Sequence, residues 1–361
     1  MGWLFRKTDW YMIGAAALLL VCGLLMLYSL SFNSPSGTQW LVRQVVWIFL
    51  GTAVFLICSF VDFRFFNHPA VIRIGYVLVL IILIAVLFFG KTVSGNRAWF
   101  VIGGFTIQPV EIAKLMLIIV LAQYFSYNNI EIWRARHIIV SASLTGLYGG
   151  LVLLQPDLGS SLVLFGIWFF MVFVSGARPK QILSFIAVFV LLFLVGWQWF
   201  FSDIQKARMT SFIFPNKDPF GVSYSQRQAI TAIGSGGVWG TGLGKGTQSH
   251  LGFLPASRTD FVFAAFAEEF GFLGVVTMAG AYALLVMRIV RIALRAESNF
   301  IRLFSVGYIT IIFLQVFVHI GMNLGFVPVI GLGLPFVSYG GSQLLMLCAG
   351  IGILNSIHAR Q

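Results

Sequence analysis

Long apolar runs, separated by short polar stretches, extend over almost the whole chain. A helix needs about 20 predominantly apolar residues to cross the hydrocarbon core of a bilayer. Ten runs meet or approach this length, which predicts an all-α, polytopic integral membrane protein. The expected helices are Trp10–Leu30, Val45–Val61, Val71–Gly90, Ile107–Phe125, His137–Leu154, Leu158–Gly176, Ile182–Phe201, Phe261–Met287, Leu303–Leu324 and Pro335–Ile357.

The longest polar segment, Ser202–Asp260, separates the seventh and eighth expected helices. It becomes glycine-rich from Gly234 to Gly252, where eight of nineteen residues are glycine, so the chain can turn tightly there. Loops of this length are usually functional or disordered, and the aromatic and apolar residues of this one favour order. We therefore expect one transmembrane domain over residues 1–361, with an ordered and functional loop at residues 202–260.

Composition excludes two broad classes of protein. Hydrophobic residues make up 59% of the 361 positions and charged residues only 9%, against roughly 25% charged in a typical soluble domain. A soluble fold of this size would lack the charged surface that it needs. The net charge of +12 does not indicate nucleic-acid binding, because the Lys and Arg residues are scattered between apolar runs without a basic cluster.

The Lys and Arg residues of the short loops predict the orientation, because cytoplasmic loops carry an excess of them. A cytoplasmic N-terminus places thirteen inside and only three in the short external loops. The thirteen are Arg6, Lys7, Arg64, Arg73, Arg134, Arg136, Arg178, Lys180, Arg288, Arg291, Arg295, Arg302 and Arg360, and the three are Arg43, Lys91 and Arg97. Both termini are therefore expected in the cytoplasm, with the long loop outside.

Five acidic residues lie in or at the edge of the expected helices: Glu111, Asp157, Asp260, Glu268 and Glu269. Ionisable groups at such positions cost several kcal/mol unless they are paired or hydrated, so each is a candidate functional residue. Glu111 and Lys114 stand three residues apart on one helical face and can pair within the membrane. Two interpretations remain open for them: a structural pair that neutralises itself, or the lining of a polar cavity in which Lys114 meets an anionic ligand.

Asp157 and Asp260 both precede an expected helix, so each could be a simple N-cap. For Asp260 a second interpretation is open, because Arg258-Thr259-Asp260 marks the point where the glycine-rich loop re-enters the membrane. Partial desolvation would raise the pKa of this carboxyl and Arg258 would lower it, which suits a general base. Glu268 and Glu269 follow about two turns later, and at most one of them is expected to face the same cavity.

Two further patterns resemble binding sites but lack residues that such sites need. The segment from Gly240 to Thr247 is similar to a phosphate-binding P-loop, but Gly246 follows its lysine where such loops have Ser or Thr. His319 lies in an apolar run with no second His or Cys nearby, so it is expected to be a hydrogen-bonded core residue rather than a metal ligand.

Several motifs together resemble the SEDS family of cell-wall proteins (RodA, FtsW and SpoVE), in the family's order and over nearly the whole chain. They are Ile107-Gln-Pro-Val-Glu111-Ile-Ala-Lys114, Gln155-Pro-Asp157-Leu-Gly-Ser-Ser, Ala232-Ile-Gly-Ser-Gly-Gly, Gly246-Thr-Gln-Ser, Leu254-Pro-Ala-Ser-Arg-Thr-Asp260-Phe, Ala267-Glu-Glu-Phe-Gly and Leu334-Pro-Phe-Val-Ser-Tyr-Gly-Gly-Ser342. The short N-terminus, His250 after Gly246-Thr-Gln-Ser, and Ile320-Gly-Met are most similar to the RodA branch. Val110 stands where the family usually has Ser, which weakens no catalytic assignment.

The resemblance implies a peptidoglycan glycosyltransferase that polymerises lipid II into β-1,4 glycan strands at the outer face of the bacterial cell membrane, for cell-wall elongation and cell shape. It implies that Asp260 is the catalytic residue and that the Glu111–Lys114 pair is functional. The residues expected to contact substrate are Glu111, Lys114, Asp157, Arg208, Arg258 and Ser338. Lys114, Arg208, Arg258 or a bound Mg²⁺, for which Asp260 is a possible ligand, would stabilise the pyrophosphate leaving group. No organic cofactor is expected.

Because the chain shows no soluble transpeptidase domain, peptide cross-linking is expected from a partner, by resemblance a class B penicillin-binding protein, together with other elongation-complex proteins. Two other functions compete with the glycosyltransferase. A lipid II flippase would need a polar route between both leaflets, whereas the unusual residues gather on the external side. A purely structural scaffold would leave Asp260 and the intramembrane charged pair unexplained.

Overall fold

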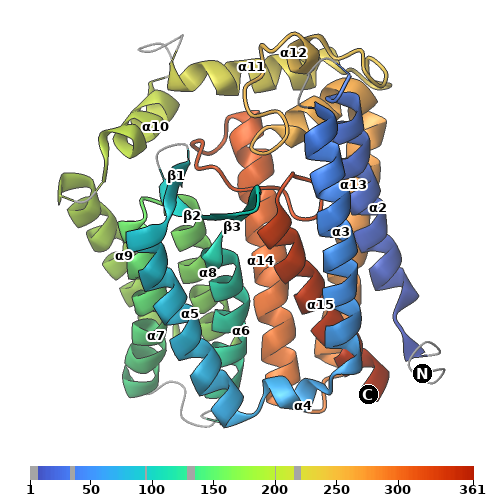
Figure 1. Ribbon diagram of the computed structural model, residues 1–361. Helices are drawn as coiled ribbons and strands as arrows, with labels where there is room; N and C mark the ends of the chain where they lie inside the picture. Colours follow the sequence, from blue (N-terminus) through green and yellow to red (C-terminus); the bar gives the residue numbers. More distant parts are fainter. Residues whose placement is uncertain (1–6, 33–36, 94–95, 128–134, 200, 215–220) are drawn as a thin grey trace.

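The apolar runs form a bundle of long helices, most of them lying nearly parallel in Figure 1. The computed structural model describes residues 7–32, 37–93, 96–127, 135–199, 201–214 and 221–361. The helices that match the ten predicted runs are α2 (Trp10–Ser29), α3 (Gly37–Phe60), α5 (Pro69–Phe89), α6 (Pro109–Tyr127), α7 (Ala135–Leu154), α8 (Leu158–Val174), α9 (Pro179–Trp199), α13 (Val262–Leu294), α14 (Asn299–Leu324) and α15 (Gly341–Arg360). Within these residues eight helices are long and apolar enough to cross a membrane, and α8 and α9 contain shorter apolar stretches. The predicted polytopic helical fold is confirmed.

The start of α2 and the end of α15, the described elements nearest the two termini, lie at the same end of the bundle, together with the short helix α4 (Phe63–Phe66) that joins α3 to α5 (Figure 1). This arrangement agrees with the predicted placement of both termini on one side. Arg6 and Arg134, which entered that prediction, lie outside the described residues.

A small antiparallel sheet precedes α6, in addition to the predicted helices. Its strands are β1 (Lys91–Val93), β2 (Asn96–Ile102) and β3 (Phe105–Ile107), in the order β1-β2-β3. Gly103 and Gly104 connect β2 to β3 with φ angles of +57° and +82°. Positive φ at both central residues suits the tight turns that match the twist of a hairpin. Because β3 ends at Ile107, α6 begins at Pro109 rather than at Ile107 as predicted.

The segment of the long loop that the structure describes is ordered, as predicted. It forms α10 (Asp203–Ile213), α11 (Val222–Ser235) and α12 (Thr247–His250) at the bundle end opposite the termini (Figure 1). A capping box starts α10: the Ser202 hydroxyl accepts from the Gln205 N–H, and the Gln205 side chain accepts from the Ser202 N–H. Residues 215–220 lie outside the described part of the loop.

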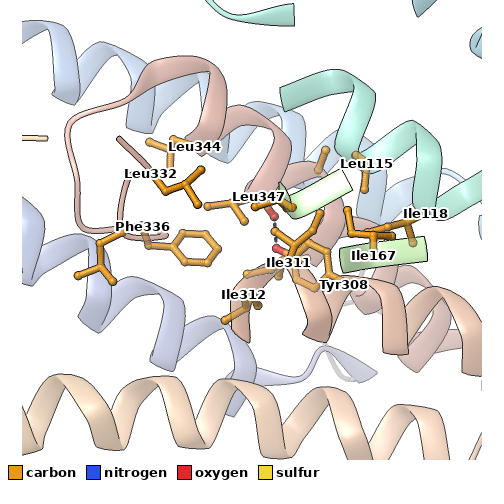
Figure 2. Close-up of a cluster of buried hydrophobic side chains, with 14 of the residues drawn as sticks. Leu115, Ile118, Ile167, Tyr308, Ile311, Ile312, Leu332, Phe336, Leu344 and Leu347 are labelled. Carbon is orange, nitrogen blue, oxygen red and sulfur yellow. Dashed lines mark hydrogen bonds between the residues drawn. The ribbon is translucent and has the colours of Figure 1, made fainter. Parts of the chain in front are cut away.

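Apolar side chains fill the space between the helices, and close helix approach depends on glycine. In Figure 2 residues from α6, α8, α14 and α15 meet around Tyr308, whose hydroxyl donates to the Leu347 carbonyl at 2.6 Å. A Cβ atom at Gly350 would overlap the Tyr308 ring, so glycine allows α15 to approach α14 here. Small residues at such crossings are a general feature of helix packing in membranes. The most extensive pairings are α3 with α15, α2 with α13, and α6 with α14.

Helix α13 is interrupted at Gly271 (φ 64°, ψ −164°), and the glycine-rich loop fills the break. The Glu268 and Glu269 carbonyls accept from the N–H groups of Thr241 and Gly242, at 2.9 and 3.0 Å. Beyond the break, the N–H groups of Phe272 and Leu273 donate to loop carbonyls, at 2.9 and 3.2 Å. The loop thus supplies the hydrogen bonds that a continuous helix would make itself, and it is fixed to the first half of α13.

Candidate active site

Asp260 lies in the turn that leads from the loop into α13, and its side chain is half-buried. The residue in the N-cap position of α13 is Phe261, without a side-chain capping bond, so the interpretation of Asp260 as an N-cap is wrong. A hydrogen bond to its backbone fixes its place instead: its carbonyl accepts from Asn323 Nδ2 of α14 at 3.0 Å. Gly331 lies beside the carboxyl, since a Cβ atom there would be 3.6 Å from Asp260 Oδ2.

The surroundings of the Asp260 carboxyl tune its protonation in opposite directions. Burial is the largest influence and raises the pKa of Asp260. The hydrogen bond from the Thr259 side chain and the positive charge of Arg208 lower the pKa, and the negative charge of Asp157 raises it. The net result is a raised pKa, which makes this carboxylate a stronger proton acceptor than an exposed aspartate.

Ser338 holds the backbone just before Asp260. Its hydroxyl donates to the Thr259 carbonyl at 2.7 Å and accepts from the Leu334 N–H at 2.7 Å. One residue further, the Tyr339 N–H donates to the Arg258 carbonyl at 2.9 Å. The Pro335–Tyr339 turn therefore packs against Asp260's segment, and α15 begins at Gly341 rather than at Pro335 as predicted. Contact of Ser338 with substrate stays a prediction, and the structure gives it a positioning role.

Asp157 caps α8, which confirms the simpler of its expected roles. Its Oδ1 accepts from the Ser160 N–H at 3.0 Å, and its Oδ2 accepts from Gln108 Nε2 at 2.9 Å. Gln108 also donates its backbone N–H to Ser342 Oγ at 3.1 Å. The starts of α6, α8 and α15 thus meet at Asp157, close enough to Asp260 for the two charges to interact.

Glu111 and Lys114 form the predicted ion pair in the first turns of α6. Lys114 Nζ lies 2.7 Å from Glu111 Oε1, and Lys114 is only 1% exposed. Glu111 also stands near the N-terminus of α6, where the helix dipole favours a negative charge. The pair follows directly after Gln108, so it lies at the same end of the bundle as Asp157 and Asp260.

Arg258 packs against the same aromatic ring as Arg43, which was expected in a short external loop. The guanidinium carbons of Arg258 and Arg43 lie 5.9 and 5.6 Å from the centre of the Trp40 ring, within the range of cation–π contact. Tyr339 packs edge-on against the same ring, at 5.0 Å between centroids. Arg43 belongs to α3, which starts at Gly37 rather than at Val45. An arginine inside an apolar run was the signal that could have identified it.

Glu268 is buried, and it binds the glycine-rich loop. Its Oε1 accepts from the Gln248 N–H at 2.7 Å, and its Oε2 accepts from the Ser249 N–H at 3.1 Å. These donors belong to the first turn of α12, where N–H groups lack helical partners. The two donors directly follow the segment that is similar to a P-loop, and they bind a carboxylate of the same chain.

The Glu269 carboxylate is also buried and fully engaged by neighbouring groups. Its Oε1 lies 2.6 Å from Ser29 Oγ and 2.7 Å from His250 Nε2, and its Oε2 accepts from the Gly244 N–H at 3.2 Å. The carboxylate therefore joins α2, α12 and α13. These contacts all lead to the loop or to α2, which agrees with the prediction that at most one of the two glutamates faces the cavity of Asp260.

His319 is a buried core residue, as expected, with its Nδ1 2.7 Å from the Leu332 carbonyl. Over the ranges that the structure describes, no three His, Cys, Asp or Glu side chains come together in a way that could hold a metal ion. The charge of Asp157 acts on Asp260, and both Asp157 oxygens are already hydrogen-bonded.

Comparison with known proteins gives a consistent result. The model of the FtsW/RodA/SpoVE cell cycle protein family matches residues 9–361. The peptidoglycan glycosyltransferase MrdB of Escherichia coli K12 is 35% identical over 99% of this chain and 96% of its own length. Stage V sporulation protein E of Bacillus subtilis is 34% identical, over 98% of each chain.

Solved structures agree with the sequence relatives. A chain from a peptidoglycan synthase complex that coordinates polymerization and crosslinking superimposes with a TM-score of 0.82, at 33% identity and 97% coverage of both chains. The rod shape determining protein RodA of Thermus thermophilus gives a TM-score of 0.73, at 32% identity, over 97% of this chain and 96% of its own. The chain therefore belongs to the FtsW/RodA/SpoVE family and is a RodA-like membrane protein of cell-wall synthesis.

Proposed function

We propose that this RodA-like peptidoglycan glycosyltransferase polymerises lipid II and that Asp260 is its general base. The observation that carries the proposal is the setting of Asp260. Asn323 and Ser338 hold the carbonyls of Asp260 and Thr259, whereas the half-buried carboxyl of Asp260 has a raised pKa and lies within the electrostatic influence of Arg208. A held backbone with a tunable carboxylate is what a proton-accepting residue requires.

The reaction can be written with these residues in place. Asp260 accepts the proton of the acceptor 4-hydroxyl while that oxygen bonds to the anomeric carbon of the donor MurNAc. The bond from this carbon to the α-linked phosphate oxygen breaks, and undecaprenyl pyrophosphate leaves with the electron pair from the opposite face. One displacement of this kind gives a β-1,4 linkage with inversion.

Cationic groups are proposed to stabilise the negative charge that develops on the leaving pyrophosphate. Arg208 acts on Asp260 electrostatically, and Arg258 is held beside Arg43 on the Trp40 ring. Lys114 offers a buried ammonium group, with Glu111 fixing its position. Fixed charges of this type act on the transition state without reorganisation, which makes them effective.

A divalent cation such as Mg²⁺ would supply further charge neutralisation. Protein sites for Mg²⁺ use one or two carboxylates together with substrate phosphate oxygens. Asp260 fits the carboxylate part of this pattern, and the pyrophosphate of the donor fits the rest. We expect chelation with EDTA to slow polymerisation by purified protein and added Mg²⁺ to restore it. Full activity after chelation would remove the cation from the proposal.

The site is proposed to face the outside of the cell membrane, with α10, α11 and α12 forming a wall that opens sideways to the outer leaflet. The support is the position of these helices at the bundle end opposite the termini, together with the excess of Lys and Arg near the termini. A lipid-linked substrate enters more easily through a lateral opening than through a closed pore. The similar peptidoglycan synthase complex supports a class B penicillin-binding protein as partner, within a larger elongation complex.

The competing function is lipid II transport between leaflets. The two are separated by adding labelled lipid II to the purified chain in vesicles, with and without its partner, and measuring both glycan products and translocated substrate. A glycosyltransferase produces glycan strands, and Asp260→Asn slows their formation by about 10²–10⁴. Translocation without glycan product would favour the flippase and contradict the proposal.

A further inference from the structure

A basic cavity lies at the bundle end where α2 begins and α15 ends. Figure 1 shows this end of the bundle far from the loop helices α10–α12. The cavity is partly open and is lined by the start of α2, the last turns of α13 and the end of α15, and its volume is about 160 Å³. A single buried water needs about 10–15 Å³, so there is room for a tetrahedral oxyanion. The lining residues are Asp9, Arg288, Arg291, Ile292, Arg295 and His358.

One side of the cavity is a fixed ionic frame. The Arg288 Nε and Nη2 atoms lie 2.8 Å from Asp9 Oδ2, and the Asp9 N–H donates to Asn355 Oδ1 at 3.2 Å. The Tyr11 ring covers the guanidinium of Arg288, at 5.2 Å from its centre. Arg288 is therefore oriented before any ligand arrives, and the carboxylate that lines the cavity is already engaged by it.

The other side carries positive charge without a matching carboxylate. Neither Arg291 nor Arg295 forms an ion pair within the described ranges, and both side chains are exposed on the last turns of α13. Arg295, Arg288 and Lys7 are near enough to His358 for their charges to act on it. Cytoplasmic orientation and the helix dipole both favour arginine near this end of α13. These two effects explain arginines near the helix end. They do not explain why three arginines line one cavity whose lining contains a single carboxylate, that of Asp9.

The cavity borders the surface that meets lipid. Tyr11, on the turn of α2 next to Asp9, is 67% exposed, and Leu294, one residue before Arg295, is 81% exposed. Exposed aromatic residues at a helix end are typical of the membrane interface. An anion in the cavity would thus stand at headgroup depth, with apolar side chains beside it for acyl chains. Basic pockets between helices at this level bind phosphate-bearing lipid headgroups.

We propose that this cavity binds a phosphate group and that the phosphate belongs to an anionic phospholipid of the leaflet nearest the chain termini. Guanidinium groups bind phosphate oxygens through paired, charge-assisted hydrogen bonds. A soluble phosphate shares this chemistry, but it would not use the exposed apolar border formed by Tyr11 and Leu294.

The test is a native mass spectrometry titration of the purified full chain in neutral detergent. The ligands are short-chain phosphatidylglycerol, the matching phosphatidylcholine, and inorganic phosphate. The variant is Arg291→Gln with Arg295→Gln, and the matched control is Arg302→Gln, an exposed arginine of α14 outside the cavity. Each basic residue near an anionic lipid contributes about fivefold in affinity, so the double variant should bind phosphatidylglycerol roughly 30-fold more weakly.

The proposal expects saturable binding of phosphatidylglycerol in preference to phosphatidylcholine, lost in the double variant and kept in Arg302→Gln. Replacing both arginines by lysine should restore part of the affinity, and unchanged unfolding temperatures show that the variants fold. Equal binding of both lipids, or phosphatidylglycerol binding that the double variant leaves intact, overturns the site. If inorganic phosphate binds as tightly as the lipid and its binding is lost equally in the double variant, the claim that the bound phosphate belongs to a phospholipid is overturned.

Discussion

Asp260 and the Glu268–Glu269 pair belong to the same end of α13, about two turns apart, and their carboxylates meet different surroundings. Both glutamates are buried, and loop N–H groups occupy oxygens of each carboxylate. At Asp260 the neighbours bind the backbone, through Asn323 and the Ser338–Thr259 contact, and the carboxyl is left with a raised pKa. The carboxylates of Glu268 and Glu269 are engaged in hydrogen bonds that hold the loop in place. Asp260 is held through its backbone instead, so its carboxylate can exchange a proton.

The largest effect is expected for Asp260→Asn. This change keeps the size of the side chain and removes proton acceptance, which is worth about 10²–10⁴ in rate for a general base. Glycan synthesis by the purified variant should fall by that factor. Asp260→Glu keeps the base but displaces it by about 1 Å, which can cost about 10²-fold. The matched control is Asp203→Asn, an exposed carboxylate in α10, and it should polymerise at a normal rate.

Next in size is the Glu111–Lys114 pair. Removing one partner leaves a buried charge without compensation, which costs roughly 3–5 kcal/mol. Glu111→Gln and Lys114→Met should each lower both stability and polymerisation. The double variant should regain much of the stability and none of the activity, as measured by thermal unfolding alongside lipid II polymerisation. Normal polymerisation in either stably folded single variant would reduce the pair to a structural role.

Glu268→Gln should reverse the pattern expected for Asp260. The amide loses two charge-assisted hydrogen bonds to the start of α12, each worth about 1.5–3 kcal/mol, and regains part through its remaining oxygen. We expect a net loss of about 2–3 kcal/mol in the free energy of unfolding, with a much smaller change in rate per folded molecule. Glu297→Gln, an exposed carboxylate between α13 and α14, is the control and should leave stability unchanged.

The smallest effect concerns pH. The base must be deprotonated to act, and burial raises the pKa of Asp260 above its ordinary value of 3.8. Activity should therefore fall as the pH decreases through this raised pKa, with a midpoint above 3.8, and be regained as the pH increases. The residual activity of Asp260→Asn should lack this acidic limb. If the loss of activity at low pH persists unchanged in Asp260→Asn, it must come from the protonation of another group.

The bundle could be predicted because each membrane helix is specified by its own apolar run. The ends of helices were harder, because they depend on contacts between distant residues. Pro335–Tyr339 is apolar enough to continue α15, yet it turns to bind the segment before Asp260. The β2–β3 hairpin had a local signal, the Gly103–Gly104 pair between two strand-like runs, which was overlooked.

In the candidate site, too, features that depend on neighbouring residues could be predicted, and features that depend on distant contacts could not. Glu111 with Lys114, and Asp157 at the start of α8, depend on spacing within a few residues and were predicted correctly. The roles of Glu268 and Glu269 could not be derived from their own helix, because their partners lie about twenty residues earlier in the loop or in α2. Arg43 was missed because α3 was predicted to begin at Val45.

A single side-by-side comparison of Asp260→Asn and Glu268→Gln decides between a chemical and a structural role for Asp260. Lipid II polymerisation and lipid II binding are measured for each variant at equal amounts of folded protein. A general base at Asp260 predicts a rate lower by about 10²–10⁴ with lipid II affinity unchanged, while Glu268→Gln polymerises within a few-fold of the unaltered chain. Near-normal polymerisation in Asp260→Asn, or a rate loss that merely follows weaker lipid II binding, would contradict the assignment.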